Sequence, residues 1–339
     1  MDTLIIRSDD STSIQTCADI IRNGGLCAFP TETVYGLGAN GLDGHAVKKI
    51  FEAKGRPQDN PLILHVSSFE QACTLWRDIP EVARRLAEVF WPGPLTVICK
   101  KSDIVPAEVC AGLDTVAVRM PSSDTAHRLI QAAGVPIAAP SANLSGKPSP
   151  TRYEHVIADM SGRVDAILCG EMCRYGVEST VISLADDPII LRPGAVTPAQ
   201  ISACIGDVKV AGSVLSPLKS GERVQSPGMK YKHYAPDARV YAFSGGEIEL
   251  TDKICREYDA HSGEKCIILA SEEYAHLYGD RNMEIIGTRL DPYTLCSKLF
   301  DAFRRYNDYD CILCETVDAQ DAGLAYMNRL LRACGFNVL

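Results

Sequence analysis

The chain has 339 residues, 46% of them hydrophobic and 23% charged, which suits about two globular domains and excludes a chain disordered throughout. Its 34 basic and 43 acidic residues give a net charge of −9, which excludes a protein that binds long nucleic acid through an overall positive charge. No apolar run approaches the roughly 20 residues that span a bilayer, and residues 1–10 do not look like a secretory signal, so we expect no membrane span and a cytoplasmic location.

Hydrophobic periodicity and turn residues predict alternating helices and strands over residues 1–206. A helix over 44–54 has Asp43 as its N-cap and Gly55 at its end. The other expected helices are 12–23, 68–77, 80–89, 123–133 and 198–204, and the expected strands are 26–30, 62–66, 95–99, 115–119, 137–141, 166–169, 179–184 and 188–192. We interpret this region as one α/β domain.

The periodic pattern is lost over residues 207–237, where proline, glycine and basic residues are scattered, and we interpret this segment as an interdomain linker. A clean alternation returns over residues 238–339. The expected strands there are 239–243, 265–270, 283–287 and 309–315, and the expected helices are 247–258, 271–278, 292–305 and 322–334. Such repetition predicts a smaller, Rossmann-like α/β domain with a mainly parallel sheet.

Fourteen cysteines are a high count, but most lie in apolar segments such as LCAF and CIIL. Free cysteine behaves as a small buried hydrophobic residue, so we expect packing rather than a disulfide framework. Cys311 and Cys314 form a C-x-x-C inside a β-like run, whereas a redox pair normally opens a helix. We therefore assign this pair no metal or redox role.

Polar and charged residues gather at the ends of the expected strands and helices of the first domain. Lys54 and Arg56 flank Gly55, either as cations that complement the helix dipole or as a phosphate clamp on a rigid loop. His65 fits a buried core histidine. Arg119, at the end of a buried strand, needs an anionic partner, which a substrate carboxylate or an internal acidic residue would supply equally well.

Eight motifs, in order, resemble the YrdC-like L-threonylcarbamoyladenylate synthase family in its long form with an extra C-terminal domain. They are PTETVYGLG (30–38), KGRPQDNPL (54–62), WPGPLT (91–96), RMP (119–121), APSANLSGKPSPT (139–151), GVESTV (176–181), LRPG (191–194) and SPGMKYKHYAP (226–236). The resemblance implies a YrdC-like, twisted open α/β sheet with a concave, locally positive site. It implies a reaction of L-threonine, bicarbonate and ATP that gives threonylcarbamoyl-AMP and pyrophosphate, for modification of the adenosine beside the anticodon of certain tRNAs.

The resemblance also implies roles for individual residues. ATP contacts would come from Lys54, Arg56, Asn60, Thr115, Ser141, Asn143, Ser149, Arg192 and Tyr234. An L-threonine pocket would be formed by Thr33, His65, Arg119, Ala139 and Ser179. Lys54 and Arg56 would be catalytic by stabilising charge on the phosphates. No residue is expected to hold a metal, because Mg²⁺ would travel on the ATP phosphates.

Alanine at Lys54 or Arg56 should severely reduce adenylate formation with little effect on folding, since exposed cations contribute little to stability. The segment 226–236, rich in Tyr, His and Lys, should act as a lid over the nucleotide; the alternative is that its aromatic residues only pack between the two domains. Two alternative functions stay open: an RNA-binding module of the same fold, and a carbamoyl transferase with another acceptor. Candidate partners beyond the substrates are tRNA and the complex that transfers the threonylcarbamoyl group.

Overall fold

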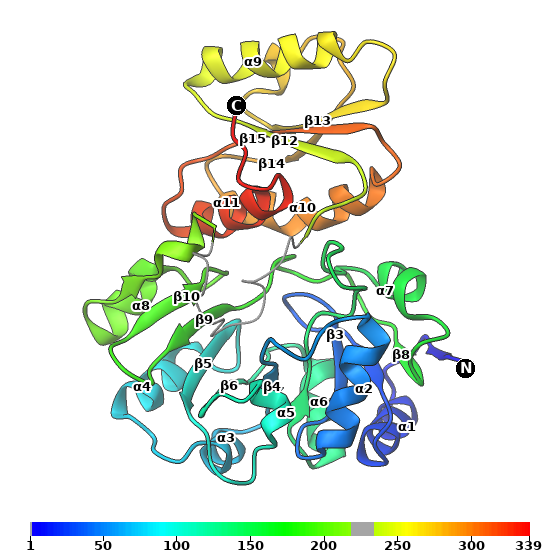
Figure 1. Cartoon of the computed structure of the whole chain (residues 1–339), viewed down its shortest axis with the longest axis vertical. Coiled ribbons are helices and arrows are strands. Elements are labelled where there is room, and N and C mark those ends of the chain that lie inside the picture. Colours follow the sequence, from blue (N-terminus) through cyan, green and yellow to red (C-terminus); the bar gives the residue numbers. More distant parts are fainter. Residues whose placement is uncertain (1, 218–233) are drawn as a thin grey trace.

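Figure 1 shows two α/β domains stacked along the long axis of the molecule; the computed structural model describes residues 2–217 and 234–339. The strands of the first domain are β1 (Leu4–Ile6), β2 (Cys27–Phe29), β3 (Gly36–Asn40), β4 (Ile63–His65), β5 (Leu95–Lys100), β6 (Thr115–Arg119), β7 (Ile137–Ala138), β8 (Ala166–Leu168), β9 (Thr180–Ser183), β10 (Ile189–Arg192) and β11 (Lys209–Val210). Its helices are α1 (Ser11–Arg22), α2 (Gly44–Lys54), α3 (Phe69–Leu75), α4 (Glu81–Phe90), α5 (Ala107–Cys110), α6 (Asp124–Ala133), α7 (Tyr153–Met160) and α8 (Pro198–Ile205).

The strands of the first domain form one mixed sheet in the order β1-β8-β2-β3-β7-β4-β6-β5-β9-β10-β11. The twisted α/β sheet expected for this domain is therefore confirmed. Strands β4 and β6 pair in parallel with His65 opposite Arg119, so both side chains reach the same end of the sheet. Strand β7, which leads into the loop of residues 139–149, is the antiparallel neighbour of β4. This arrangement of strand ends builds the wall of the site.

The second domain has the expected small sheet, in which β12 (Arg239–Phe243), β15 (Cys311–Glu315), β13 (Cys266–Ser271) and β14 (Met283–Gly287) are neighbours in that order. Its described pairings are all parallel, so the Rossmann-like prediction is confirmed. Helix α9 (Glu247–Ala260) covers the outer face, and α10 (Pro292–Arg305) and α11 (Asp321–Ala333) lie toward the first domain (Figure 1).

Several elements differ from the sequence predictions. The prediction of a helix over 271–278 is wrong, and only a 3₁₀ turn, Ala275–Leu277, forms there. Strand β13 continues to Ser271, and the Tyr278 hydroxyl donates to the Glu315 carboxylate at 2.9 Å, so the segment does not form an α-helix. Strand β3 lies in a glycine-rich segment for which the sequence predicts no strand. A Cβ at Gly38 would lie 2.8 Å from the Phe29 ring, so glycine there allows close packing between paired strands.

The sheet of the first domain runs past residue 206, the end expected for that domain. Residues 209–210 are strand β11, paired with β10, so the first sheet extends beyond residue 206. Part of the expected linker, residues 218–233, lies outside the described residues. The two domains share one apolar cluster, in which Val34 and Val177 pack with residues of the second domain such as Phe300 and Leu330. The domains therefore meet through a packed interface.

Two cysteines depart from the expected free thiols. Cys266 and Cys311 form a disulfide between β13 and β15, with their Cα atoms 4.8 Å apart. They are opposite each other in the register of two neighbouring strands, and a separation of 45 residues hides this pairing from the sequence. Cys314 is a buried free thiol, as expected, and so the C-x-x-C is not a bonded pair.

Candidate active site

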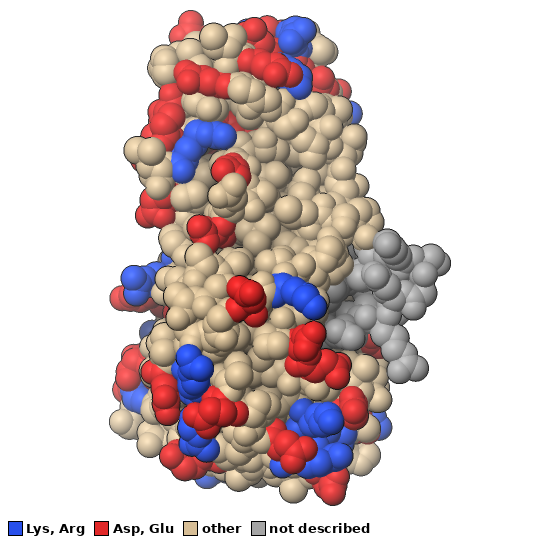
Figure 2. All heavy atoms as spheres, turned by 90° about the vertical axis from the view of Figure 1, so that its left-hand side faces the viewer, with Lys and Arg blue, Asp and Glu red and all other residues tan. Residues whose placement is uncertain are grey.

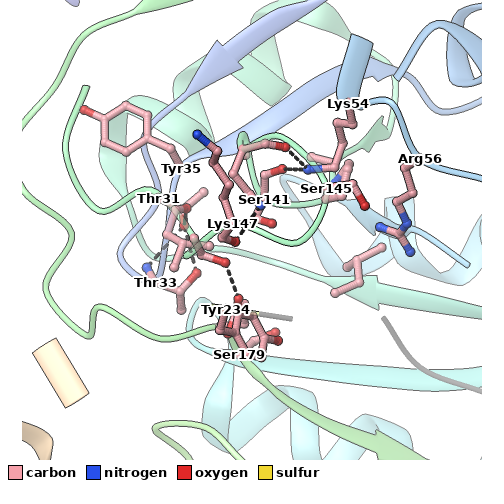
Figure 3. A pocket seen from close by; sticks show the side chains of 18 of the residues that line it. Thr31, Thr33, Tyr35, Lys54, Arg56, Ser141, Ser145, Lys147, Ser179 and Tyr234 are labelled. Carbon is pink, nitrogen blue, oxygen red and sulfur yellow. Dashed lines mark hydrogen bonds between the residues drawn. The ribbon is translucent and has the colours of Figure 1, made fainter. Parts of the chain in front are cut away.

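A hollow that is open to solvent lies where β4, β6 and the loop of residues 139–149 meet (Figure 3). Twelve of the fourteen residues predicted for the site line it: Thr33, Lys54, Arg56, His65, Arg119, Ala139, Ser141, Asn143, Ser149, Ser179, Arg192 and Tyr234. The fold thus brings together residues up to about 200 positions apart.

Lys54 occupies the last turn of α2, which Gly55 ends in a left-handed conformation with φ of 61°. Its Nζ donates to the carbonyl oxygens of Ser141 at 2.5 Å and Asn143 at 2.6 Å, and the side chain is buried. Burial, with Arg56 nearby, lowers the pKa of Lys54 well below its ordinary value. Lys54 therefore holds the loop of residues 139–149 as well as facing the pocket, and the expectation that it is an exposed cation is wrong.

The loop of residues 139–149 is held at several points. The Asn143 side-chain amide donates to the carbonyl oxygens of Leu144 at 2.7 Å and Lys147 at 2.9 Å. The backbone N–H of Ser145 donates to the carbonyl of Lys54 at 3.0 Å. Figure 3 shows Ser141, Ser145 and Lys147 along this loop, with Lys54 reaching its backbone. A loop held in this way presents hydroxyl and N–H groups in a fixed arrangement, which anion binding requires.

Arg119 has an internal acidic partner. Its guanidinium forms a buried ion pair with Glu32 at 2.7 Å, and it donates to Thr33 Oγ1 at 2.9 Å and to the Gly93 carbonyl at 3.3 Å. Burial raises the pKa of Glu32, but Arg119 outweighs burial and the net shift is downward. Of the two alternatives left open by the sequence, the internal carboxylate is present, and Arg119 still lines the pocket beside Thr33.

His65 is a buried neutral histidine in the pocket wall. Burial, with Arg119 nearby, lowers its pKa to about 3. Its ring packs against the Phe29 ring in a T-shaped arrangement, with ring centroids 6.3 Å apart. A neutral imidazole offers one donor and one acceptor, which suits a hydroxyl group of a substrate better than an anion.

The buried histidines predict a loss of stability below neutral pH. His155, also pushed down by burial, has a pKa of about 4. Both rings stay neutral in the folded chain but take up protons on unfolding below about pH 6.5, so stability falls as the pH falls through that window. From pH 7 to pH 5, the free energy of unfolding should fall by about 2 kcal/mol per histidine. Denaturant titrations at both pH values measure the change.

The variant His65→Gln should remove roughly half of this pH dependence. The pKa values of Glu32 and Glu178 are lowered in the folded chain, so their contribution to its stability is lost only as the pH falls below about 4.5. They therefore contribute little to the change between pH 7 and pH 5. The same slope in the variant and the natural chain would contradict the assignment of a neutral buried His65.

The opposite wall of the pocket is formed by residues before β9 and at the end of β10. Ser179 Oγ shares a hydrogen bond with Thr96 Oγ1 at 2.7 Å, and the Arg192 guanidinium donates to Ser179 Oγ at 3.1 Å and to its carbonyl at 3.0 Å. Burial lowers the pKa of Arg192 to about 10, so it stays a cation at neutral pH. Ser149 Oγ donates to Glu178 Oε1 at 2.5 Å.

Tyr234 reaches the pocket from the C-terminal side of the linker. It is buried, with φ of 68°, and its ring lies 5.0 Å from that of Phe300. Figure 3 shows it beside Ser179. Residues 226–233 of the expected lid lie outside the described residues.

Two predicted residues do not line the pocket. Asn60 is fully buried ahead of β4, and Thr115 begins β6, some 13 Å along the strand from Arg119. Motif membership does not reveal which end of a strand a residue occupies. The pocket also contains residues that the prediction missed: Thr31, Tyr35, Ser145, Lys147 and Glu178. Lys147 and Glu178 lie within motifs that carry the resemblance, and their charge is the sequence signal by which they could be predicted as pocket residues.

The described lining is strongly cationic. It contains Lys54, Arg56, Arg119, Lys147 and Arg192 against the single carboxylate of Glu178. On the face shown in Figure 2, acidic and basic side chains are intermixed, without a basic stripe. Positive charge is thus concentrated in the pocket of an acidic chain, as expected for a small polyanionic ligand.

Comparisons with known proteins agree with this site. Residues 19–194 match the Sua5/YciO/YrdC family model, described as telomere recombination, and residues 196–335 match the model of the threonylcarbamoyl-AMP synthase C-terminal domain. The threonylcarbamoyl-AMP synthases of Pyrococcus abyssi and Bacillus subtilis are each 46% identical to this chain. The alignments cover 96% and 98% of this chain and 95% and 96% of those proteins, respectively.

Solved structures also show similarity over the full length of the chain. A Pyrococcus abyssi protein complexed with L-threonine superposes with a TM-score of 0.92 at 44% identity, over 100% of this chain and 99% of that one. In the parts of the chain that are described, no helix has both the length and the apolar character to cross a bilayer. Two family models and full-length similarity together show that the chain belongs to the threonylcarbamoyl-AMP synthase family, in the form with a C-terminal domain.

Proposed function

We propose that the chain makes threonylcarbamoyl-AMP and pyrophosphate from L-threonine, bicarbonate and ATP, for modification of tRNA beside the anticodon. The observation that carries this proposal is that two kinds of binding group line one pocket. Arg119, Thr33 and His65 suit an amino acid, whereas Lys54 and the loop of residues 139–149 suit phosphates. A pocket with both kinds of group suits a reaction that joins the two ligands.

The threonine end is assigned to Arg119, Thr33, His65, Ser179 and the backbone of Ala139. Glu32 and Thr33 hold the Arg119 guanidinium, to which we assign the threonine carboxylate. The neutral His65 ring is suited to hydrogen bond the threonine hydroxyl. The similar Pyrococcus abyssi protein was solved in complex with L-threonine, and this supports a threonine site in the present chain.

The nucleotide end is assigned to a second group of lining residues. These are Lys54, Arg56, Ser141, Asn143, Ser149, Arg192 and Tyr234. Arg56 carries charge that stabilises the phosphates, and bound phosphates would favour the charged form of Lys54 against the effect of its burial. Lys54 also fixes the loop through two carbonyls. Assignments of Asn60 and Thr115 to ATP rest on the resemblance alone, since neither lines the pocket.

The chemistry needs positioning more than it needs a covalent nucleophile. The threonine amine adds to the bicarbonate carbon, and loss of water gives a carbamate. A carbamate oxygen then attacks the α-phosphorus of ATP, the bond to the bridging oxygen breaks, and pyrophosphate leaves with the electron pair. Holding the reactants in line is worth up to about 7–11 kcal/mol of the barrier. The cations of the pocket stabilise the charge that develops on the phosphates.

Mg²⁺ is proposed to enter as part of the ATP substrate. Glu178 is the single acidic side chain in the described lining, and its oxygens already accept from Ser149 and Arg329. One group of three potential metal ligands occurs among the described residues, Glu264, Cys266 and Cys311, and it includes the disulfide. Hard divalent cations with few protein carboxylates are bound through substrate phosphates.

Pyrophosphate release tests the proposal. The natural chain should release pyrophosphate only when ATP, L-threonine and bicarbonate are all present. Arg56→Gln should lower the rate by about 100-fold, because a cation is lost at the phosphates. Arg22→Gln on the surface of α1 is the matched control and should match the natural chain. Release without threonine, or binding of RNA without release, would favour the carbamoyl-transferase or RNA-binding alternative instead.

A further inference from the structure

Helix α11 of the second domain places a charged side chain behind the nucleotide end of the pocket. Arg329 is fully buried and donates through Nε to Glu178 Oε2 at 3.0 Å and through Nη1 to the Pro193 carbonyl at 2.6 Å. Its Nη2 donates to the Glu178 carbonyl at 3.2 Å. Figure 1 places α11 above β10, and these bonds join it to the first domain there.

The two first-domain residues to which Arg329 donates hydrogen bonds adjoin pocket residues in the sequence. Glu178 precedes Ser179, and Pro193 follows Arg192. This part of the first domain is closely packed, since a Cβ added at Gly194 would lie 2.3 Å from the Thr180 nitrogen. The β9–β10 pairing is irregular at this point. The Arg329 guanidinium therefore connects the residues just before β9 and just after β10, which lie next to pocket residues.

Charge balance gives Arg329 a second effect. Glu178 is 7% exposed, lines the pocket and points one carboxylate oxygen at Ser149 and the other at Arg329. Burial raises the pKa of Glu178, but Arg329, followed by Arg192, outweighs burial and keeps it ionised. Without Arg329, a buried carboxylate would face a ligand that carries several negative charges.

We infer that Arg329 is a positioning residue through which the C-terminal domain prepares the nucleotide end of the pocket, by neutralising Glu178 and fixing the turn after Arg192. This inference rests on the proposed function, because the ligand concerned is ATP. It assigns the second domain a part in ATP binding, although Arg329 itself does not line the pocket. Ser179 directly follows Glu178, but Arg119, the residue assigned to the threonine carboxylate, is held by Glu32, so threonine binding should depend less on Arg329 than ATP binding does.

Calorimetric titration with Mg²⁺-ATP, without threonine, tests the inference. Arg329→Met should weaken ATP binding by about tenfold or more, because Glu178 loses the larger of its two counter-charges. Arg329→Lys keeps the charge and should lose no more than about threefold. Adding Glu178→Gln to Arg329→Met removes the orphaned charge and should restore ATP affinity to within about threefold of the natural chain.

Two controls separate positioning from a general structural role. Threonine affinity, measured separately, should change by less than about threefold in all three variants. Arg152→Gln removes a different contact between the domains, the ion pair with Asp301, and should leave ATP affinity unchanged. If Arg329→Met does not fold, the ATP affinities of Arg329→Lys and of the double variant test the inference.

Equal losses for both ligands, or a double variant that does not regain ATP affinity, would overturn the inference. A natural chain that binds ATP but releases no pyrophosphate with all three substrates would instead overturn the proposed function. In that case the ATP affinities would still report on Arg329.

Discussion

Lys54→Ala should abolish pyrophosphate release and also destabilise the fold. The expected loss of rate is at least about 100-fold, and the free energy of unfolding should fall by about 2–4 kcal/mol, because two buried carbonyls lose their donor. Single-turnover assays and denaturant titrations measure the two effects. Both follow from one ammonium group that holds the loop of residues 139–149 and faces the phosphate end of the pocket.

The same helix offers a matched control for Lys54. Lys48 is half-exposed and pairs with Glu108 at 3.3 Å, so Lys48→Ala should cost less than about 1 kcal/mol and leave turnover unchanged. Arg56→Gln should lose activity with a smaller loss of stability. Lys54→Ala with normal turnover would show that Lys54 acts only as a helix-end cation.

Arg119→Gln should have the largest effect on stability. It leaves Glu32 as a buried carboxylate without its counter-charge, which costs about 3–5 kcal/mol. Threonine binding should weaken by about 10- to 100-fold, because hydrogen bonds to the threonine carboxylate are lost. Denaturant titration and calorimetry with threonine measure the two losses.

Two companion variants distinguish the roles of Arg119. Glu32→Gln combined with Arg119→Gln removes both charges, so it should regain much of the stability without regaining threonine affinity. Arg119→Lys keeps the charge but not the planar fork, so threonine affinity should still fall. Equal losses of ATP and threonine affinity in Arg119→Lys would place the residue in the core rather than at the amino-acid end.

Local signals predict much of the fold. Helix α2, with its Asp43 cap and Gly55 end, has the bounds that the sequence predicts, and the parallel sheet of the second domain follows from the alternation of its elements. The short strand β1 and the glycine-rich β3 escape prediction, because their formation depends on neighbouring strands rather than on local pattern. The helix expected over 271–278 fails for the same reason, since Glu315, far away in the sequence, anchors Tyr278.

Motifs predict most of the site's members but not their environments. The sequence offers Arg119 either a substrate carboxylate or an internal acid, and only the fold shows that Glu32 is beside it. The sequence indicates that Lys54 is an exposed cation at a helix end, whereas in the structure Lys54 is buried beside the loop of residues 139–149. Arg329 carries no motif at all. Its importance depends on the packing of one domain against the other, which no spacing along the chain records.

The formation of one labelled product tests the central claim most directly. The natural chain should be incubated with ATP, ¹⁵N-threonine and ¹³C-bicarbonate, and the nucleotides should be separated rapidly and analysed by mass spectrometry. We predict an adenylate that carries both labels, formed in equal amount with pyrophosphate. AMP or ADP without the labelled adenylate, at matched enzyme concentration, would contradict the proposed function.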